Sequence, residues 1–199
     1  MRSIQLLLDE VVQAEFGVSD LSRIRAVAAD KVAASGRGPG LGSRAMAFIE
    51  ATASVRRRPE AEMYAFIGTR LAPLAFKEVP GLLRSYQSTR SILLQVTRVA
   101  PTVLDALVPG LPYPEFDVEL IDGDTMRVGF DGPESLADLF EGVALGIAQY
   151  FNERIIVSRA NPPAYAPNRR MVDVRVIPER RNRDGAAPGG VERRRFFGT

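Results

Sequence analysis

The sequence predicts an α+β domain in which an N-terminal helical layer packs on a C-terminal four-stranded antiparallel sheet with a crossing helix. Three observations predict it. Apolar residues recur every three to four positions from residue 4 to about residue 107, which is typical of amphipathic helices. From residue 116 the apolar period changes to two, as in half-buried strands. Between the second and third of these strands, residues 135–151 form a longer apolar helical segment.

Five helices are expected in the first half of the chain, separated by glycines and prolines. Gly17 ends the first, and Ser19 caps the second. Ser43 opens the third, and Pro59 suits the first turn of the fourth. The fifth should be one long helix from about Ser88 to Leu107. Proline bends and stops the fourth and fifth helices, at Pro73, Pro80, Pro101 and Pro109.

The second half begins with a predicted hairpin. Phe116, Val118 and Leu120 alternate with polar residues, and Asp122-Gly123 is a strong turn signal. Alternation resumes from Met126 to Phe130 on the returning strand. Two further strands are expected around residues 155–157 and 172–176.

The helix between these strand pairs carries small residues at regular intervals. Ser135 is expected to cap it, and its glycines include Gly142 and Gly146. Because a glycine lets another backbone approach closely, we expect this helix to pack tightly against the sheet.

The residue inventory limits the chemistry of any site. The chain contains no histidine and no cysteine. This excludes His- and Cys-based zinc sites, Ser-His-Asp and Cys-His nucleophilic centres, and both common axial ligands of haem iron. Acidic pairs occur at Asp122 with Asp124 and at Asp131 with Glu134, in a turn and at a helix start, where acids commonly stabilise structure. No enzymatic activity is therefore predicted.

Charge is concentrated at the C-terminus. The net charge is +2, and the last twenty residues contain six arginines. The rest of the chain is acidic, so we do not expect the folded part to bind nucleic acid. Residues 1–179 are expected to form one domain and 180–199 an Arg-rich disordered tail. No apolar run is long enough for a membrane span, and no signal peptide is recognisable, so a cytoplasmic location is expected.

Three local signatures, in this order, resemble the H-NOX family of haem nitric oxide/oxygen sensors. The first is Leu6 to Val12 followed by Phe16-Gly17, and the second is Phe66-Ile67-Gly68. The third runs from Pro114-Glu115-Phe116 through the hairpin to a helix marked by Gly142 and Gly146 and then to Ile155-Ile156-Val157. The resemblance implies the fold predicted above, a sensory role and a signalling partner protein.

Both haem-binding motifs that the resemblance implies are altered. The position of the proximal histidine falls at about Thr97, and a threonine hydroxyl is a poor iron ligand. The propionate-binding Tyr-x-Ser-x-Arg motif matches Phe130, Gly132 and Glu134, so an acid stands where an arginine would pair with a propionate. Haem is therefore not the expected cofactor.

A pocket without haem is either filled by side chains or open to another ligand. Its walls, by the resemblance, are Ile4, Leu8, Phe66, Ile67, Leu71, Leu74, Leu93, Val96, Thr97, Pro114 and Phe130. Such walls suit a slender apolar ligand such as a fatty acid, whose carboxylate Arg98 or Arg127 could meet; ordinary core packing is the competing interpretation.

Three hypotheses follow. The first is a haem-independent sensory domain that binds an apolar small molecule and a partner protein. The second is a haem-based gas sensor with a non-histidine ligand, for which Met63, Tyr64 and Lys77 are the candidates. The third is a structural adaptor with a filled pocket, which uses its arginine-rich tail for contact.

Overall fold

A computed structural model describes residues 2–34, 40–79, 81, 84–109 and 114–178 of the chain. Its helical half contains long helices and one short one, and its second half contains the sheet and a further helix. In chain order the elements are α1 (Ile4–Ala34), α2 (Leu41–Arg56), α3 (Glu60–Glu78), α5 (Thr89–Leu93), α6 (Val96–Leu107), β1 (Phe116–Leu120), β2 (Thr125–Asp131), α7 (Glu134–Tyr150), β3 (Arg154–Ala160) and β4 (Arg169–Ile177).

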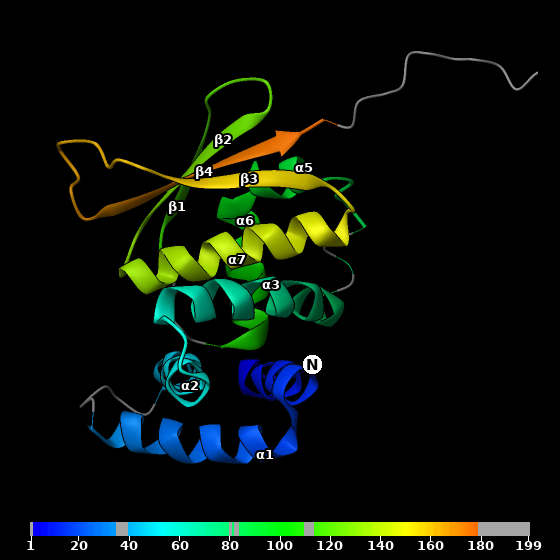
Figure 1. Ribbon diagram of the computed structural model, residues 1–199. Coiled ribbons are helices and arrows are strands. Elements are labelled where there is room, and N and C mark those ends of the chain that lie inside the picture. Colours follow the sequence, from blue (N-terminus) through cyan, green and yellow to red (C-terminus); the bar gives the residue numbers. More distant parts are fainter. Residues whose placement is uncertain (1, 35–39, 80, 82–83, 110–113, 179–199) are drawn as a thin grey trace, which may run out of the picture.

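These elements are stacked in layers (Figure 1). The sheet forms one end, α7 lies beneath it and α3 beneath α7, and α2 lies beside the first part of α1 in the next layer. The second part of α1 forms the opposite end of the molecule. Helices α5 and α6 contact the sheet, and α6 also contacts α3. None of the described helices combines the length and the apolar character that a membrane span requires.

The sheet confirms the predicted strands and their antiparallel pairing. Its strand order is β1-β2-β4-β3. The hairpin between β1 and β2 closes on Asp122, whose Oδ1 accepts hydrogen bonds from the backbone N–H groups of Asp124 (2.8 Å) and Thr125 (2.7 Å). Aspartate is frequent in turns because its side chain can accept hydrogen bonds from the backbone in this way.

The two faces of the sheet differ in chemistry because side chains alternate along each strand. Val128, Val172 and Val174 are fully buried on the inner face, where they cluster with apolar residues of α5, α6 and α7. On the outer face Arg127 lies opposite Asp173, and the two form an ion pair of 2.7 Å.

The glycines of α7 face α3, so the expectation that they pack against the sheet is wrong. A Cβ atom at Gly142 would overlap the carbonyl oxygen of Ala65 in α3, and one at Gly146 would overlap that of Thr69. A Cβ atom at Gly68 of α3 would likewise overlap backbone atoms of α7. The face of α7 that meets the sheet carries Ala137, Phe140, Ala144 and Ile147 instead. Periodicity shows which face a glycine occupies but not which neighbour that face meets.

Three helix boundaries also differ from the prediction. The long fifth helix is broken into α5 and α6 at Leu94 and Gln95, while Pro101 lies within α6. The apolar stripe continues in phase across the break, so periodicity alone could not reveal it. Pro133, rather than Ser135, occupies the N-cap position of α7. The third helix begins at Leu41.

Other boundaries agree with the sequence. Ser88 caps α5 by a reciprocal pair of hydrogen bonds with Ser91. Gly17, with φ of 86°, separates the two parts of α1 by a kink. Pro59 marks the start of α3, although it is the N-cap residue rather than part of the first turn as predicted. Pro80 and the expected tail, residues 180–199, lie outside the described residues.

The interior consists of two apolar clusters. One joins α1, α2 and α3 with the end of α6, and the other joins α5, α6 and α7 with the sheet. Because α3 and α7 contact each other more extensively than any other pair of elements, the glycine-lined contact connects the two clusters.

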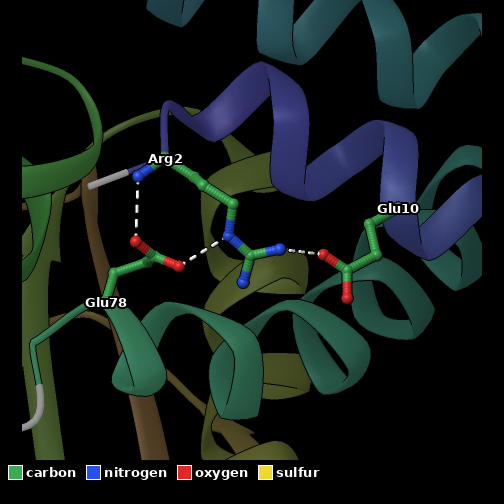
Figure 2. A network of polar contacts seen from close by, with 3 residues as sticks. All are labelled: Arg2, Glu10 and Glu78. Carbon is green, nitrogen blue, oxygen red and sulfur yellow. Dashed lines mark hydrogen bonds and ion pairs between the residues drawn. The ribbon is translucent and has the colours of Figure 1, made fainter.

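A polar cluster ties the start of α1 to the end of α3 (Figure 2). The carboxylate of Glu78 accepts hydrogen bonds from the backbone N–H of Arg2 (2.8 Å) and from its guanidinium Nε (2.6 Å). The same guanidinium also pairs with Glu10. These bonds lower the pKa of Glu78, with the backbone bond contributing most.

We expect Gly142→Ala to lower the free energy of unfolding by about 3 kcal/mol, because the added methyl group would force α7 away from the α3 backbone. Gly123→Ala is the matched control, since no atom lies near its Cβ position in the hairpin turn. Urea denaturation of both variants measures the difference. Equal stability of the two would contradict the close contact.

Glu78→Gln should make the free energy of unfolding less dependent on pH in the acidic range. A carboxylate whose pKa is lowered by folding stabilises the protein above its unfolded pKa, and this contribution is lost as the pH falls through the folded pKa. Between about pH 6 and about pH 3 the unchanged protein should therefore lose more stability than the variant. Urea titrations at several pH values test this, with exposed Glu115→Gln as the control; parallel curves for Glu78→Gln and the unchanged protein would refute it.

Candidate functional site

The segment from Phe130 to Glu134, which matches the altered propionate motif, links β2 to α7. Phe130 is fully buried, and its ring centroid lies 5.3 Å from that of Phe116 and 5.4 Å from that of Phe140. These distances are typical of favourable aromatic contacts. Three rings from β1, β2 and α7 therefore fill the inner face of the sheet at this point.

The acid of this segment has a cationic partner. Glu134 Oε2 lies 3.2 Å from Nη1 of Arg170 in β4, and Arg170 Nε donates a 3.0 Å hydrogen bond to the carbonyl oxygen of Gly132. The Glu134 side chain is 62% exposed, so this pair contributes little to stability. Its effect on geometry is more definite, because one guanidinium engages both the carbonyl and the carboxylate of the turn.

The neighbouring arginine acts on the other face of the same strand. Arg169 pairs with Asp117 of β1 and lies 3.6 Å from Asp131. Consecutive residues of a strand point to opposite faces, so Arg169 and Arg170 hold the Asp131–Glu134 segment from two sides. An anionic ligand at this turn would meet Asp131 and Glu134 in place of the family's arginine.

In helix α6, the position matched to the family's proximal histidine does not face the interior. Thr97 is exposed, whereas Val96 and Val99 are buried. Arg98 donates a 3.0 Å hydrogen bond from Nη2 to the hydroxyl of Tyr86. The other candidate for a ligand carboxylate, Arg127, donates two bonds to Asp173 on the outer face of the sheet, which raise its pKa.

The proposed pocket walls are divided between the two apolar clusters. Ile4, Leu8, Ile67 and Leu71 are buried in the helical cluster, and Phe66 and Leu74 pack against it. Leu93, Val96 and Phe130 belong to the sheet cluster, and Pro114 is half-buried before β1.

The three candidates for a non-histidine iron ligand lie in different surroundings. Met63 and Tyr64 are buried in the helical cluster, and the Tyr64 hydroxyl lies 3.5 Å from the carbonyl oxygen of Met46 in α2. Lys77 is exposed.

Two surface hollows lie along α1, away from these walls. One is lined by Leu6, Asp9, Glu10, Gln13, Ala14 and Arg25. The second is lined by Gln5, Arg25, Ala28, Ala29, Val32, Arg44 and Phe48, so Arg25 borders both. Sequence reasoning missed them because they depend on the bend of α1 at Gly17, whose angle periodicity does not reveal. The sequence did offer one signal for this region. Asp9 lies beside an apolar stripe, and a buried charge there needs a partner of opposite charge.

A salt bridge connects the two parts of α1 beside these hollows. Arg25 Nη2 lies 2.6 Å from Oδ2 of Asp9, which is 8% exposed as a residue. This bond raises the pKa of Arg25. Arg44 and the largely buried Phe48 also line the second hollow. The lining of the second hollow therefore combines apolar side chains with two arginines, one of which is paired with Asp9.

The donor set does not fit haem. The chain has no histidine or cysteine, the two common axial ligands of haem iron. At the positions matched to the propionate partners stand a buried phenylalanine, a glycine and a glutamate that already pairs with Arg170.

Comparison with known families identifies the domain. The family model described as haem-NO-binding matches residues 7–159. The chain belongs to the haem-NO-binding family. The match includes the helical layer, the hairpin, α7 and nearly all of β3, and it confirms the H-NOX resemblance. H-NOX domains are sensor domains, so a sensory domain is the class to which this chain belongs. A search among curated proteins found no match.

Solved H-NOX structures share the fold. An NMR structure of an H-NOX domain from Shewanella oneidensis in the Fe(II)CO state has a TM-score of 0.73 at 17% identity, covering 89% of this chain and 99% of that one. A crystal structure from S. oneidensis in the Fe(II)NO state gives 0.71 at 17% identity, with 88% and 98% covered. An unliganded Fe(II) H-NOX mutant from K. algicida gives 0.70 at 13% identity, with 88% and 96% covered. At these identities the likeness establishes the fold alone.

Restoring the family's tyrosine should destabilise this H-NOX domain. In Phe130→Tyr the new hydroxyl would be buried among phenylalanine rings, and an unsatisfied buried hydroxyl costs about 1–3 kcal/mol. Phe116→Tyr is the matched control, because Phe116 is only half-buried and a hydroxyl introduced there has a shorter path to water. Thermal unfolding compares the two; a Phe130→Tyr variant as stable as the unchanged protein would mean that the hydroxyl finds a polar partner there.

Proposed function

We propose that this H-NOX domain is a haem-independent sensory module that binds an apolar small molecule and transmits its occupancy to a partner protein. One observation supports this above the others: the chain lacks both common side-chain ligands of haem iron throughout its length. The acid at the turn adds to it, since Glu134 replaces a propionate partner by a group that repels a propionate.

The ligand we propose is a small apolar carboxylate, such as a fatty acid. The family pocket walls are apolar, but they are divided between two clusters and Phe130 fills part of the space. The second hollow on α1 offers a better match to the carboxylate. There Arg44 lies among apolar lining residues, and a guanidinium binds a carboxylate in a bidentate manner; Arg25, which also lines the hollow, is already paired with Asp9.

A structural adaptor with a filled pocket is the second candidate, and the three-ring cluster favours it. Phe130, at the position matched to the motif's tyrosine, is fully buried against the rings of Phe116 and Phe140, which supports a filled interior. An adaptor of this kind would bind its partner constitutively. The gas-sensor alternative with a non-histidine ligand has weaker support, because Met63 and Tyr64 lie in the helical cluster and Lys77 is exposed.

The protein purified from haem-supplemented cells should show no Soret band, and added haem should not produce a saturable one. Visible spectroscopy measures this directly. A stoichiometric Soret band that disappears in Tyr64→Phe, Met63→Leu or Lys77→Ala would overturn the proposal and establish a gas sensor with that ligand.

Native mass spectrometry of the same preparation separates the two remaining functions. A sensor should carry a co-purified small molecule or take up decanoate, and Arg44→Glu should weaken decanoate binding while Arg98→Glu should not. Protein that carries no small molecule and does not bind decanoate would contradict the ligand and favour the adaptor.

A further inference from the structure

The loop between β3 and β4 presents one tyrosine almost entirely to solvent. Tyr165 is 90% exposed, compared with 47% for Tyr150 and 53% for Ile156, which are also large exposed apolar residues. The loop sequence is Asn161-Pro-Pro-Ala-Tyr-Ala-Pro-Asn168, which contains no charged residue. An aromatic ring at this exposure, with no role in the core, is the kind of residue that anchors protein interfaces.

Backbone hydrogen bonds and prolines restrict this loop before any partner binds. The N–H of Ala166 donates to the carbonyl oxygen of Pro163 (2.9 Å), and the N–H of Arg169 donates to that of Ala166 (3.1 Å). Pro162, Pro163 and Pro167 each have a restricted φ. A segment restricted in this way loses little conformational entropy on binding, so more of the contact energy contributes to affinity.

The base of the loop is held by the two arginines that hold the turn matched to the propionate motif. Arg169 pairs with Asp117 and Asp131, and Arg170 binds Glu134 and the carbonyl oxygen of Gly132. Tyr165 is only four residues from Arg169 in the sequence. The side chains of Arg169 and Arg170 in turn contact the Asp131–Glu134 segment. A partner seated on the loop would therefore contact residues that lie next in sequence to the two arginines that contact this turn.

The composition of the loop indicates the chemistry of its partner. With no charge between Asn161 and Asn168, electrostatic recognition by a charged groove is not favoured. The loop contains three rings close together in sequence, those of Pro162, Pro163 and Tyr165, which could pack on an apolar surface. Grooves lined by aromatic side chains bind such segments, because proline rings fit between flat aromatic rings at little entropic cost.

We propose that the Tyr165 loop docks into an aromatic-lined groove of a partner protein, of the type that reads proline-rich segments. This proposal deepens the partner-dependent role proposed above and rests on it. Tyr165 supplies the central apolar contact, and Pro162 and Pro163 supply the flanking rings.

The test uses the full chain and, as a probe of this groove chemistry, a purified WW domain that binds Pro-Pro-x-Tyr peptides. Isothermal titration calorimetry should give saturable one-to-one binding. Tyr165→Ala should weaken it by at least about tenfold, as expected for an anchoring residue. Ile156→Ala, which removes an exposed apolar side chain from the adjacent strand, should leave the affinity unchanged. Both variants should keep the unfolding temperature of the unchanged protein, since neither residue is in the core.

Salt dependence distinguishes this loop from the arginine-rich C-terminus. Binding through an uncharged loop should change less than about twofold between low and high salt, because there is no ion pair to screen. Absence of binding, binding retained in Tyr165→Ala, or binding that weakens steeply with salt would each overturn the proposal. Failure here is separable from failure of the proposed function, because the visible spectrum and decanoate binding do not involve Tyr165.

Discussion

The close contact between α3 and α7 is the interaction on which the rest of the structure depends. Glycines 68, 142 and 146 remove the side chains that would separate the two helix backbones. The apolar cluster of the helical layer and that of the sheet meet across this contact. This helix pair therefore joins the two clusters into one continuous interior.

The family site illustrates how an altered motif can be accommodated by residues outside it. Phe130 packs with two other phenylalanine rings, and Glu134 pairs with Arg170 from a different strand. The arginine that the family motif would place in the turn is thus replaced by an acid in the turn and an arginine on β4. At this position of the turn the charge of the residue is reversed, although Arg170 of β4 pairs with the acid. This reversal, together with the lack of histidine, is the physical basis for proposing a sensory domain that works without haem.

Features that the family motifs do not include lie at two other places. The bend of α1 at Gly17 sets Arg25 against Asp9 and creates hollows bordered by arginines. At the opposite end, the β3–β4 loop exposes Tyr165 above the turn held by Arg169 and Arg170. The first is chemically suited to a carboxylate and the second to an apolar groove on a protein. A sensory module requires a ligand site and an output surface on separate elements, and these are the roles that we propose for the two features.

Composition and local patterns were enough to predict the fold class, the strands and their turns, and the residue types on which no site can be built. Alternation from Phe116 to Phe130 and the Asp122-Gly123 turn depend only on local periodicity and local hydrogen bonds, so both were predictable. Absence of a residue type needs no structure at all. Tertiary structure alone decided that the glycines of α7 face α3, that the fifth helix breaks at Gln95, and that Thr97 is exposed. Each of these depends on which neighbour a face meets, and a one-dimensional pattern carries no information about neighbours distant in sequence.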